Sequence, residues 1–173
     1  MSFSDTAMRL TVYTDYTLRV MMYLAVKHRD GSLATIDGIA QAYAISRNHL
    51  MKIVNELAQN GFIETVRGRT GGARLARPPG EISIGSLVRM AEEDFTLVAC
   101  HDTVNPHHCA IFEACNLKRR LARALDAFMA ELDGMTLEEA ISAPTVAASL
   151  LGFEVRPVKM PVSRRKRAPS ESM

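Results

Sequence analysis

The sequence lacks any long hydrophobic run, and no uninterrupted apolar stretch approaches the ~20 residues of a membrane-spanning helix. Its first residues, MSFSDTAMRLTVYTD, also lack the basic-then-apolar order of a secretory signal peptide. The net charge is only +2, so overall charge indicates little about partners. Apolar residues make up 47% and charged residues 23%, which is typical of a globular protein. We therefore expect a cytoplasmic protein that contacts no membrane.

Recognisable catalytic motifs are missing as well. The chain has no CxxC pair, no pattern that couples a nucleophile to a base, and no cofactor-binding loop. An enzyme that uses Cys100 or Cys109 as a redox nucleophile is one interpretation of the sequence. Without these motifs we do not expect an enzyme.

Cysteine is scarce, and all three cysteines lie within the sixteen residues from Cys100 to Cys115. Three thiols are too many for one disulfide and one too few for a four-thiolate metal site. In the cytoplasm, clustered cysteines are more often metal or redox groups than structural disulfides. The residues alone leave three solutions open: a reactive thiol beside a disulfide, an iron–sulfur cluster with a non-cysteine ligand, or a zinc site completed by a histidine. The histidines of the loop are His101, His107 and His108.

The first part of the chain has the pattern of a helix-turn-helix. Apolar residues at helical spacing predict a helix from Thr14 to about His28. Thr35 is a good N-cap for a second helix, and Ser46 for a third that ends at Gly61. Only a short break separates the second helix from the third, and this arrangement is typical of a helix-turn-helix.

A β-hairpin is predicted directly after the third helix. FIETVRG and ARLAR are strand-like, and the glycines between them supply a turn. A hairpin in this place is a wing. Residues 8–93, which include a further short helix to about Glu93, are therefore predicted to form a winged helix-turn-helix domain, and the cysteine loop follows as residues 94–116.

One long amphipathic helix is predicted from about Ala114 to Asp133. Its apolar stripe contains Leu117, Leu121, Leu125 and Phe128. This helix and a shorter helical segment, TLEEAIS, make up residues 114–144. Residues 145–173, with prolines around SRRKR, are predicted to be a disordered basic tail. The expected fold class is mainly α with a small β-hairpin wing, a winged helix-turn-helix plus a long helix.

Polar side chains face away from the apolar stripe of the third helix. Asparagine, glutamine, lysine and arginine pair with base edges in the major groove, which recognition helices enter N-terminus first. A plain solvated face is the other interpretation. The wing favours DNA, because six cationic residues stand against two acidic ones between Ser46 and Arg77. The predicted DNA-binding residues are Ser46, Arg47, Asn48, His49, Lys52, Asn55, Arg67, Arg69 and Arg74.

Three stretches resemble a known family in sequence and in order. They are MRLTVYTDYTLRVMMYLA, ISRNHLMKIVNELAQNGFIETVRGRTGGARLAR and the three-cysteine loop, within about Met8 to Pro144. The chain is similar to winged-helix regulators that include the iron–sulfur assembly regulator IscR and the iron-responsive RirA, and most closely to the nitric-oxide-sensing repressors among them. The resemblance implies a homodimer, joined along the stripe from Leu117 to Phe128, that binds double-stranded operator DNA.

The resemblance further implies that nitric oxide is the signal and that nitric-oxide detoxification or denitrification genes are repressed until it arrives. An iron- or redox-responsive regulator of the same family is the alternative. A zinc-stabilised DNA-binding module without sensing is a further one.

The resemblance also assigns the ligands of an iron–sulfur cluster, [4Fe–4S] rather than [2Fe–2S]. They are Cys100, Cys109 and Cys115. IscR places a histidine three residues after its third cysteine, where this chain has Lys118. The nitric-oxide-sensing relatives use an aspartate from the partner subunit, and the matching residue is Asp15. Without the family, Asp15 is interpreted as a first-turn carboxylate that complements a helix dipole.

The cysteine spacing departs from those relatives in one place. Eight residues separate Cys100 from Cys109, more than is typical of them, whereas the five between Cys109 and Cys115 are ordinary. The longer segment holds the three histidines, which is why zinc stays an alternative.

Overall fold

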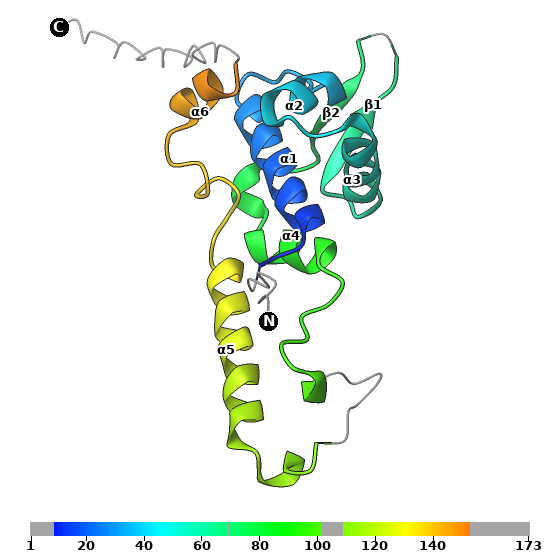
Figure 1. The fold of residues 1–173 in the computed structure, drawn as a ribbon. Helices are drawn as coiled ribbons and strands as arrows, with labels where there is room; N and C mark the ends of the chain where they lie inside the picture. Colours follow the sequence, from blue (N-terminus) through cyan, green and yellow to red (C-terminus); the bar gives the residue numbers. More distant parts are fainter. Residues whose placement is uncertain (1–8, 69, 102–108, 153–173) are drawn as a thin grey trace, which may run out of the picture.

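The computed structural model describes residues 9–68, 70–101 and 109–152, and these form a mainly helical chain with one two-stranded antiparallel sheet (Figure 1). The elements in chain order are α1 (Val12–His28), α2 (Ile36–Tyr43), α3 (Arg47–Gln59), β1 (Ile63–Val66), β2 (Gly72–Leu75), η1 (Pro79–Glu81), α4 (Ile84–Ala91), η2 (Ala99–His101), η3 (Phe112–Ala114), α5 (Asn116–Asp133) and α6 (Pro144–Leu150). The elements from α1 to α4 form a body from which α5 extends as an arm (Figure 1).

Helix α1 runs through the centre of the body. It packs against α3, β2 and α4, and Val20, Met21 and Leu24 are almost completely buried as a result. Leu50 and Leu57 on the inner face of α3 are fully buried as well. Each such side chain contributes about 1.5–3 kcal/mol through its removal from water. The recognition helix is thus fixed to the rest of the protein through its contacts with α2, α1 and β1.

The predicted helix-turn-helix is confirmed. Thr35 Oγ1 accepts a hydrogen bond from Gly38 N at 3.0 Å and begins α2, and Ser46 Oγ accepts one from His49 N at 3.3 Å and begins α3. The turn between the helices contains Ala44 with φ +54°, the left-handed conformation that ends α2 and lets α3 start in a new direction.

The predicted hairpin is also present, and its register pairs Ile63 with Leu75. Ala73 of β2 exchanges backbone hydrogen bonds of 2.8 and 2.9 Å with Ala34, which joins the wing to the segment before α2. Gly72 is required at this junction, because a Cβ there would lie 2.6 Å from the Ala34 carbonyl oxygen. The wing is therefore held in a fixed position beside the helix-turn-helix.

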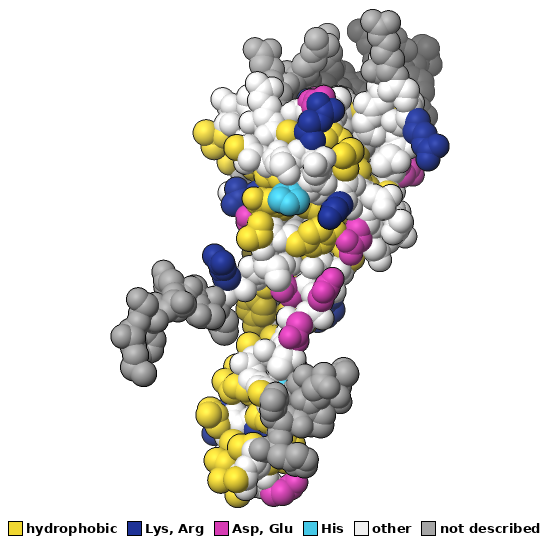
Figure 2. Space-filling model, turned by 45° about the vertical axis from the view of Figure 1, so that its right-hand side comes forward, with side chains coloured by type: hydrophobic (Ala, Val, Ile, Leu, Met, Phe, Trp, Pro, Cys, Tyr) yellow, Lys and Arg dark blue, Asp and Glu magenta, His cyan; other side chains and the backbone are white. Residues whose placement is uncertain are grey.

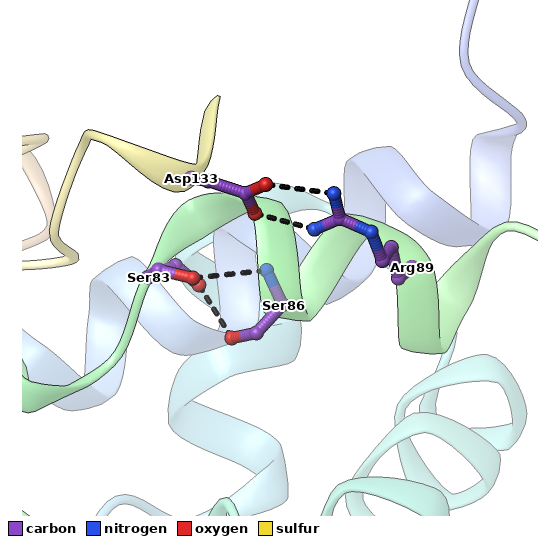
Figure 3. A network of polar contacts seen from close by, with 4 residues as sticks. All are labelled: Ser83, Ser86, Arg89 and Asp133. Atoms are coloured by element: carbon purple, nitrogen blue, oxygen red, sulfur yellow. Dashed lines mark hydrogen bonds and ion pairs between the residues drawn. The ribbon is translucent and has the colours of Figure 1, made fainter. Parts of the chain in front are cut away.

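The base of α5 is attached to α4. Figure 3 shows the Arg89 guanidinium facing both oxygens of the Asp133 carboxylate, with Nη2 and Oδ2 2.7 Å apart. Ser83 caps α4 by accepting a hydrogen bond from Ser86 N at 3.1 Å (Figure 3). Along α5 itself only Met129 is buried. The helix is thus anchored at its C-terminal end and exposed over most of its length.

Two predictions for the C-terminal part are wrong. Residues 136–142, the TLEEAIS segment, form turns rather than a helix, because Thr136 forms a β-bridge with Ser83 and Leu137 is buried completely. Helix α6 lies in the stretch predicted to be disordered from residue 145. It forms because it packs on α1 and buries Ala148. The rest of the predicted tail, residues 153–173, lies outside the described residues. None of the helices described is both long and apolar enough to span a bilayer.

Candidate nucleic-acid interface and cysteine loop

The outer face of α3 carries the predicted DNA-reading side chains, and all of them are exposed. They are Ser46, Arg47, Asn48, His49, Lys52 and Asn55. The opposite face of the same helix buries Leu50, Ile53, Val54 and Leu57, as the helical periodicity predicts. A helix that is buried on one side and polar on the other, with its N-terminus open, has the geometry that major-groove binding needs.

Two of the predicted DNA-binding arginines form ion pairs on the protein surface. Arg47 Nη1 lies 2.5 Å from Asp37 Oδ1 of α2, and Arg74 Nη2 lies 2.7 Å from Glu64 Oε2 across the hairpin. Both pairs are more than half exposed, so each holds its arginine weakly and leaves it able to exchange a carboxylate for a phosphate. In the described chain, no carboxylate pairs with Lys52, and Arg69 lies outside the described residues.

The cysteine loop begins and ends against the first turn of α5. Cys100 lies in η2 and is half-buried, and Cys115 is the N-cap residue of α5 and is also half-buried. His101 Nε2 lies 3.0 Å from the Lys118 carbonyl oxygen, a hydrogen bond that joins η2 to α5. This contact keeps Cys100 and Cys115 at the same end of the arm.

The three cysteines are free thiols, and Cys109 is exposed. Their chemistry fits an iron–sulfur cluster, since thiolates are the ligands such clusters need and no disulfide uses any of them. In the residues that the structure describes, no three His, Cys, Asp or Glu side chains lie close enough together to hold a metal. The described part of one protomer therefore does not bring these ligands together. Two of the candidate zinc ligands, His107 and His108, lie outside the described residues.

Asp15 lies in the first turn of α1, where its carboxylate complements the helix dipole. Its Oδ2 pairs with Arg19 Nε at 2.9 Å, and its side chain is 49% exposed. The protomer does not gather Asp15 and the three cysteines into one group. The carboxylate faces solvent and is accessible to a second subunit.

The sequence did not reveal two contacts that hold this first turn. Glu92 Oε2, just after α4, accepts hydrogen bonds from Thr11 N at 3.0 Å and Thr14 Oγ1 at 2.6 Å. Tyr13 Oη donates a hydrogen bond to the Glu56 carboxylate on α3. Both join residues more than forty positions apart, so no local pattern predicts them. The sequence feature that could have pointed to the first contact is the acidic pair Glu92 and Glu93, which directly follows α4.

The predicted apolar stripe of α5 is largely uncovered in one protomer. Leu117 is 64% exposed and Phe128 45% exposed, and Leu121 and Leu125 are half-buried. Ile111, just before the helix, is also exposed. Figure 2 shows hydrophobic side chains gathered along the arm. Large apolar side chains exposed together along one helix are typical of a protein–protein interface.

Comparison with known proteins gives the same fold and a family. Residues 10–143 match the Rrf2 model, described as iron-dependent transcriptional regulator. The chain is 48% identical to the HTH-type transcriptional regulator NsrR of Bacillus subtilis over 134 residues, which cover 78% of this chain and 90% of that protein. It is 44% identical to NsrR of Oceanobacillus iheyensis, with 85% and 99% covered.

Among solved structures, CymR, the global cysteine regulator of B. subtilis, superposes with a TM-score of 0.62 at 29% identity, with 79% of this chain and 98% of that chain covered. The T. potens IscR structure superposes with a TM-score of 0.61 at 21% identity, with 78% and 87% covered, and this likeness concerns the fold alone. With a family model matched over most of its length and relatives above 40% identity, the chain belongs to the Rrf2 family of iron-dependent transcriptional regulators, and it is a DNA-binding regulator rather than an enzyme.

Proposed function

We propose that the protein is a homodimeric, cytoplasmic repressor that binds double-stranded operator DNA, senses nitric oxide through an iron–sulfur cluster, and controls nitric-oxide detoxification or denitrification genes. The observation that supports it most is the place of the three free thiols, between a complete winged helix-turn-helix and a long helix with an uncovered apolar stripe. A chemical change at the thiols would thus occur between the DNA-reading body and the candidate dimer interface, where it can affect both.

Cys100, Cys109 and Cys115 would hold the cluster, [4Fe–4S] in preference to [2Fe–2S], and the partner subunit's Asp15 would complete it. When bound, such a cluster supplies an iron that can take up nitric oxide. A carboxylate oxygen is a harder ligand than a thiolate and is the easiest of the four to displace. Asp15 lies on the exposed side of α1, where a partner subunit can reach it. Breaking its ion pair with Arg19 costs little free energy, because both side chains of that pair are nearly half exposed.

The residues of this chain provide a direct route from the ligand to the DNA-reading face. Asp15 lies in the first turn of α1, and α1 packs against α3. A dimer whose subunits are tied together through Asp15 holds two recognition helices at one spacing, which paired operator half-sites require. Loss of the tie changes that spacing and weakens operator binding.

Anaerobic purification, visible absorption, and iron and sulfide analysis test the cofactor. We expect a coloured protein whose affinity for an operator fragment, selected from random DNA by the cluster-loaded dimer, falls when nitric oxide is added. If the affinity for the operator fragment is unchanged after the cluster has reacted completely with nitric oxide, this mechanism is wrong. The family's description as iron-dependent favours one alternative signal, so parallel titrations with an iron chelator and with peroxide separate nitric-oxide sensing from iron or redox sensing.

Mixed dimers test the ligand from the partner subunit. One subunit carries Cys115→Ser and the other Asp15→Ala, so neither homodimer has an intact site. If the ligand crosses the interface, the mixed dimer has one complete cluster that resists chelators like that of the wild type. Asp37→Ala in place of Asp15→Ala is the matched control, since Asp37 is also a first-turn carboxylate paired with an arginine. A mixed dimer no more resistant than the Asp15→Ala homodimer would contradict the assignment.

A further inference from the structure

The first turn of α1 contacts the rest of the protein through consecutive residues. Tyr13 Oη donates a hydrogen bond to the Glu56 carboxylate of α3, and Thr14 Oγ1 donates one to Glu92 after α4. Asp15 projects toward solvent with half of its side chain exposed. Successive residues of an α-helix point about 100° apart, so one turn faces three directions. This turn therefore contacts α3 and the segment before the cysteine loop, and it carries the proposed cluster ligand.

The Tyr13–Glu56 contact lies in an acidic hollow of about 480 Å³. Its lining includes Glu92 and Asp94 together with the two bonded residues, and acidic side chains gather where the arm meets the body (Figure 2). The Tyr13 hydroxyl supplies the hydrogen-bond donor to the Glu56 carboxylate in this hollow. Without that donor, the Glu56 carboxylate would share the hollow with three other carboxylates, those of Glu92, Glu93 and Asp94, and would lose its own hydrogen-bond partner.

Glu56 is well placed to move the recognition helix. It follows Asn55 of the DNA-reading face directly and lies one turn after Lys52, so a shift of Glu56 shifts both. On the other side, Glu92 holds Thr11 and Thr14 and so connects the same turn to the chain that leads into the cysteine loop. Glu56 therefore joins α3 by a polar contact to the first turn of α1, which in turn contacts the segment before the cysteine loop.

We propose that the hydrogen bond between Tyr13 and Glu56 transmits the state of the cluster to the recognition helix. Tyr13 and Glu56 are positioning residues: they contact neither cluster nor base, and they make α3 follow the first turn of α1. The inference rests on the proposed function, because the turn responds to the cluster only if Asp15 is its ligand. It adds the residues through which the response reaches α3.

Tyr13→Phe tests the inference by removing a single hydroxyl. The readout is the ratio of operator affinities of the cluster-loaded and cluster-free protein, measured on one DNA fragment. We expect this ratio to fall at least about fivefold, the lower limit for a typical allosteric coupling, while iron content and visible absorption stay those of the wild type. Tyr43→Phe is the matched control, since it removes a half-buried hydroxyl from α2, and should leave the ratio unchanged.

Variants of Glu56 separate coupling from charge. Glu56→Gln keeps an acceptor oxygen for Tyr13 and should preserve the ratio, whereas Glu56→Ala should reduce it as Tyr13→Phe does. Both remove a negative charge near DNA and so raise the affinity of both forms, which is why the ratio is measured. If Tyr13→Phe and Glu56→Ala both keep the wild-type ratio of operator affinities, the inference is wrong but the proposed function is not affected. A wild-type ratio near one would overturn the proposed function and the inference together.

Discussion

At the scale of single residues, Asp133 shows how one carboxylate fixes the base of the arm. The hydrogen bonds from Arg89 hold the pKa of Asp133 below its ordinary value of 3.8, with the guanidinium charge acting in the same direction (Figure 3). A carboxyl group whose pKa is lowered by folding stabilises the folded state at any pH at which it is ionised in both the folded and the unfolded protein. That stabilisation is present above the ordinary pKa and is lost as the pH falls through the folded pKa.

Asp133→Asn should therefore lower the free energy of unfolding at neutral pH and have a much smaller effect in acid. The measurement is urea unfolding of the cluster-free protein at pH 7 and at successively lower pH, with wild type and variant compared at each. Asp126→Asn is the control, because Asp126 is exposed on the same helix and forms no ion pair with the residues described. A wild-type advantage that stays constant down to pH values well below 3.8 would show that the ion pair is not its source.

At the scale of elements, helix α5 depends on how closely its last turn approaches α4. A Cβ on Gly85 would lie 2.0 Å from Asp133 Oδ1 and 2.9 Å from Asp133 N, and the backbone nitrogen cannot move without the helix. Gly85→Ala should thus separate α4 from α5 and cost about 1–3 kcal/mol, as overpacking of a tight contact does. Thermal unfolding of the cluster-free protein measures the loss.

Gly134→Ala provides the comparison for that substitution. Gly134 ends α5 with ordinary helical angles, and its Cβ would meet backbone oxygens at 3.5 Å or more. This variant should keep the stability of the wild type or gain about 0.4–1 kcal/mol, since alanine restricts the unfolded chain more than glycine. If the two variants unfold at the same temperature, the close approach of α4 and α5 is not what Gly85 provides.

The elements that the sequence predicted well are those with local causes. Thr35 and Ser46 each begin a helix by accepting a backbone hydrogen bond within three residues, and such caps are visible in the sequence. Helix α6 was missed because its support is the burial of Ala148 against α1, which no local pattern reveals. TLEEAIS has helical composition, but its β-bridge to Ser83 imposes turns.

The candidate site follows the same division. Periodicity and charge identified the exposed face of α3, because a helix with one buried side must expose the other. The pairing of Arg47 with Asp37 and of Tyr13 with Glu56 depends on how helices pack, so the sequence did not predict it. The spacing of the cysteines does not give the geometry of a metal site, since among the described residues the three thiols do not lie together as one metal-sized group.

At the scale of the whole molecule, the uncovered stripe of α5 predicts that the protein does not exist as a monomer. Leu117 and Phe128 lie on the arm, away from the core. Burial of their apolar area against a second subunit is worth roughly 25 cal/mol per Å². Leu117→Asp with Phe128→Asp places two charges in the proposed seam. We expect a folded monomer by light scattering, with the circular dichroism of the wild type.

Leu150→Asp is the control for the surface substitutions, because Leu150 is 82% exposed on α6 and should leave the dimer intact. The monomer should bind operator DNA far more weakly, since one winged helix makes too few contacts for tight binding. It should also lose chelator-resistant iron, because Asp15 of a second subunit is no longer present. A double variant that remains dimeric would show that another surface joins the subunits. A monomer that keeps its cluster would show that the fourth ligand lies within the same chain.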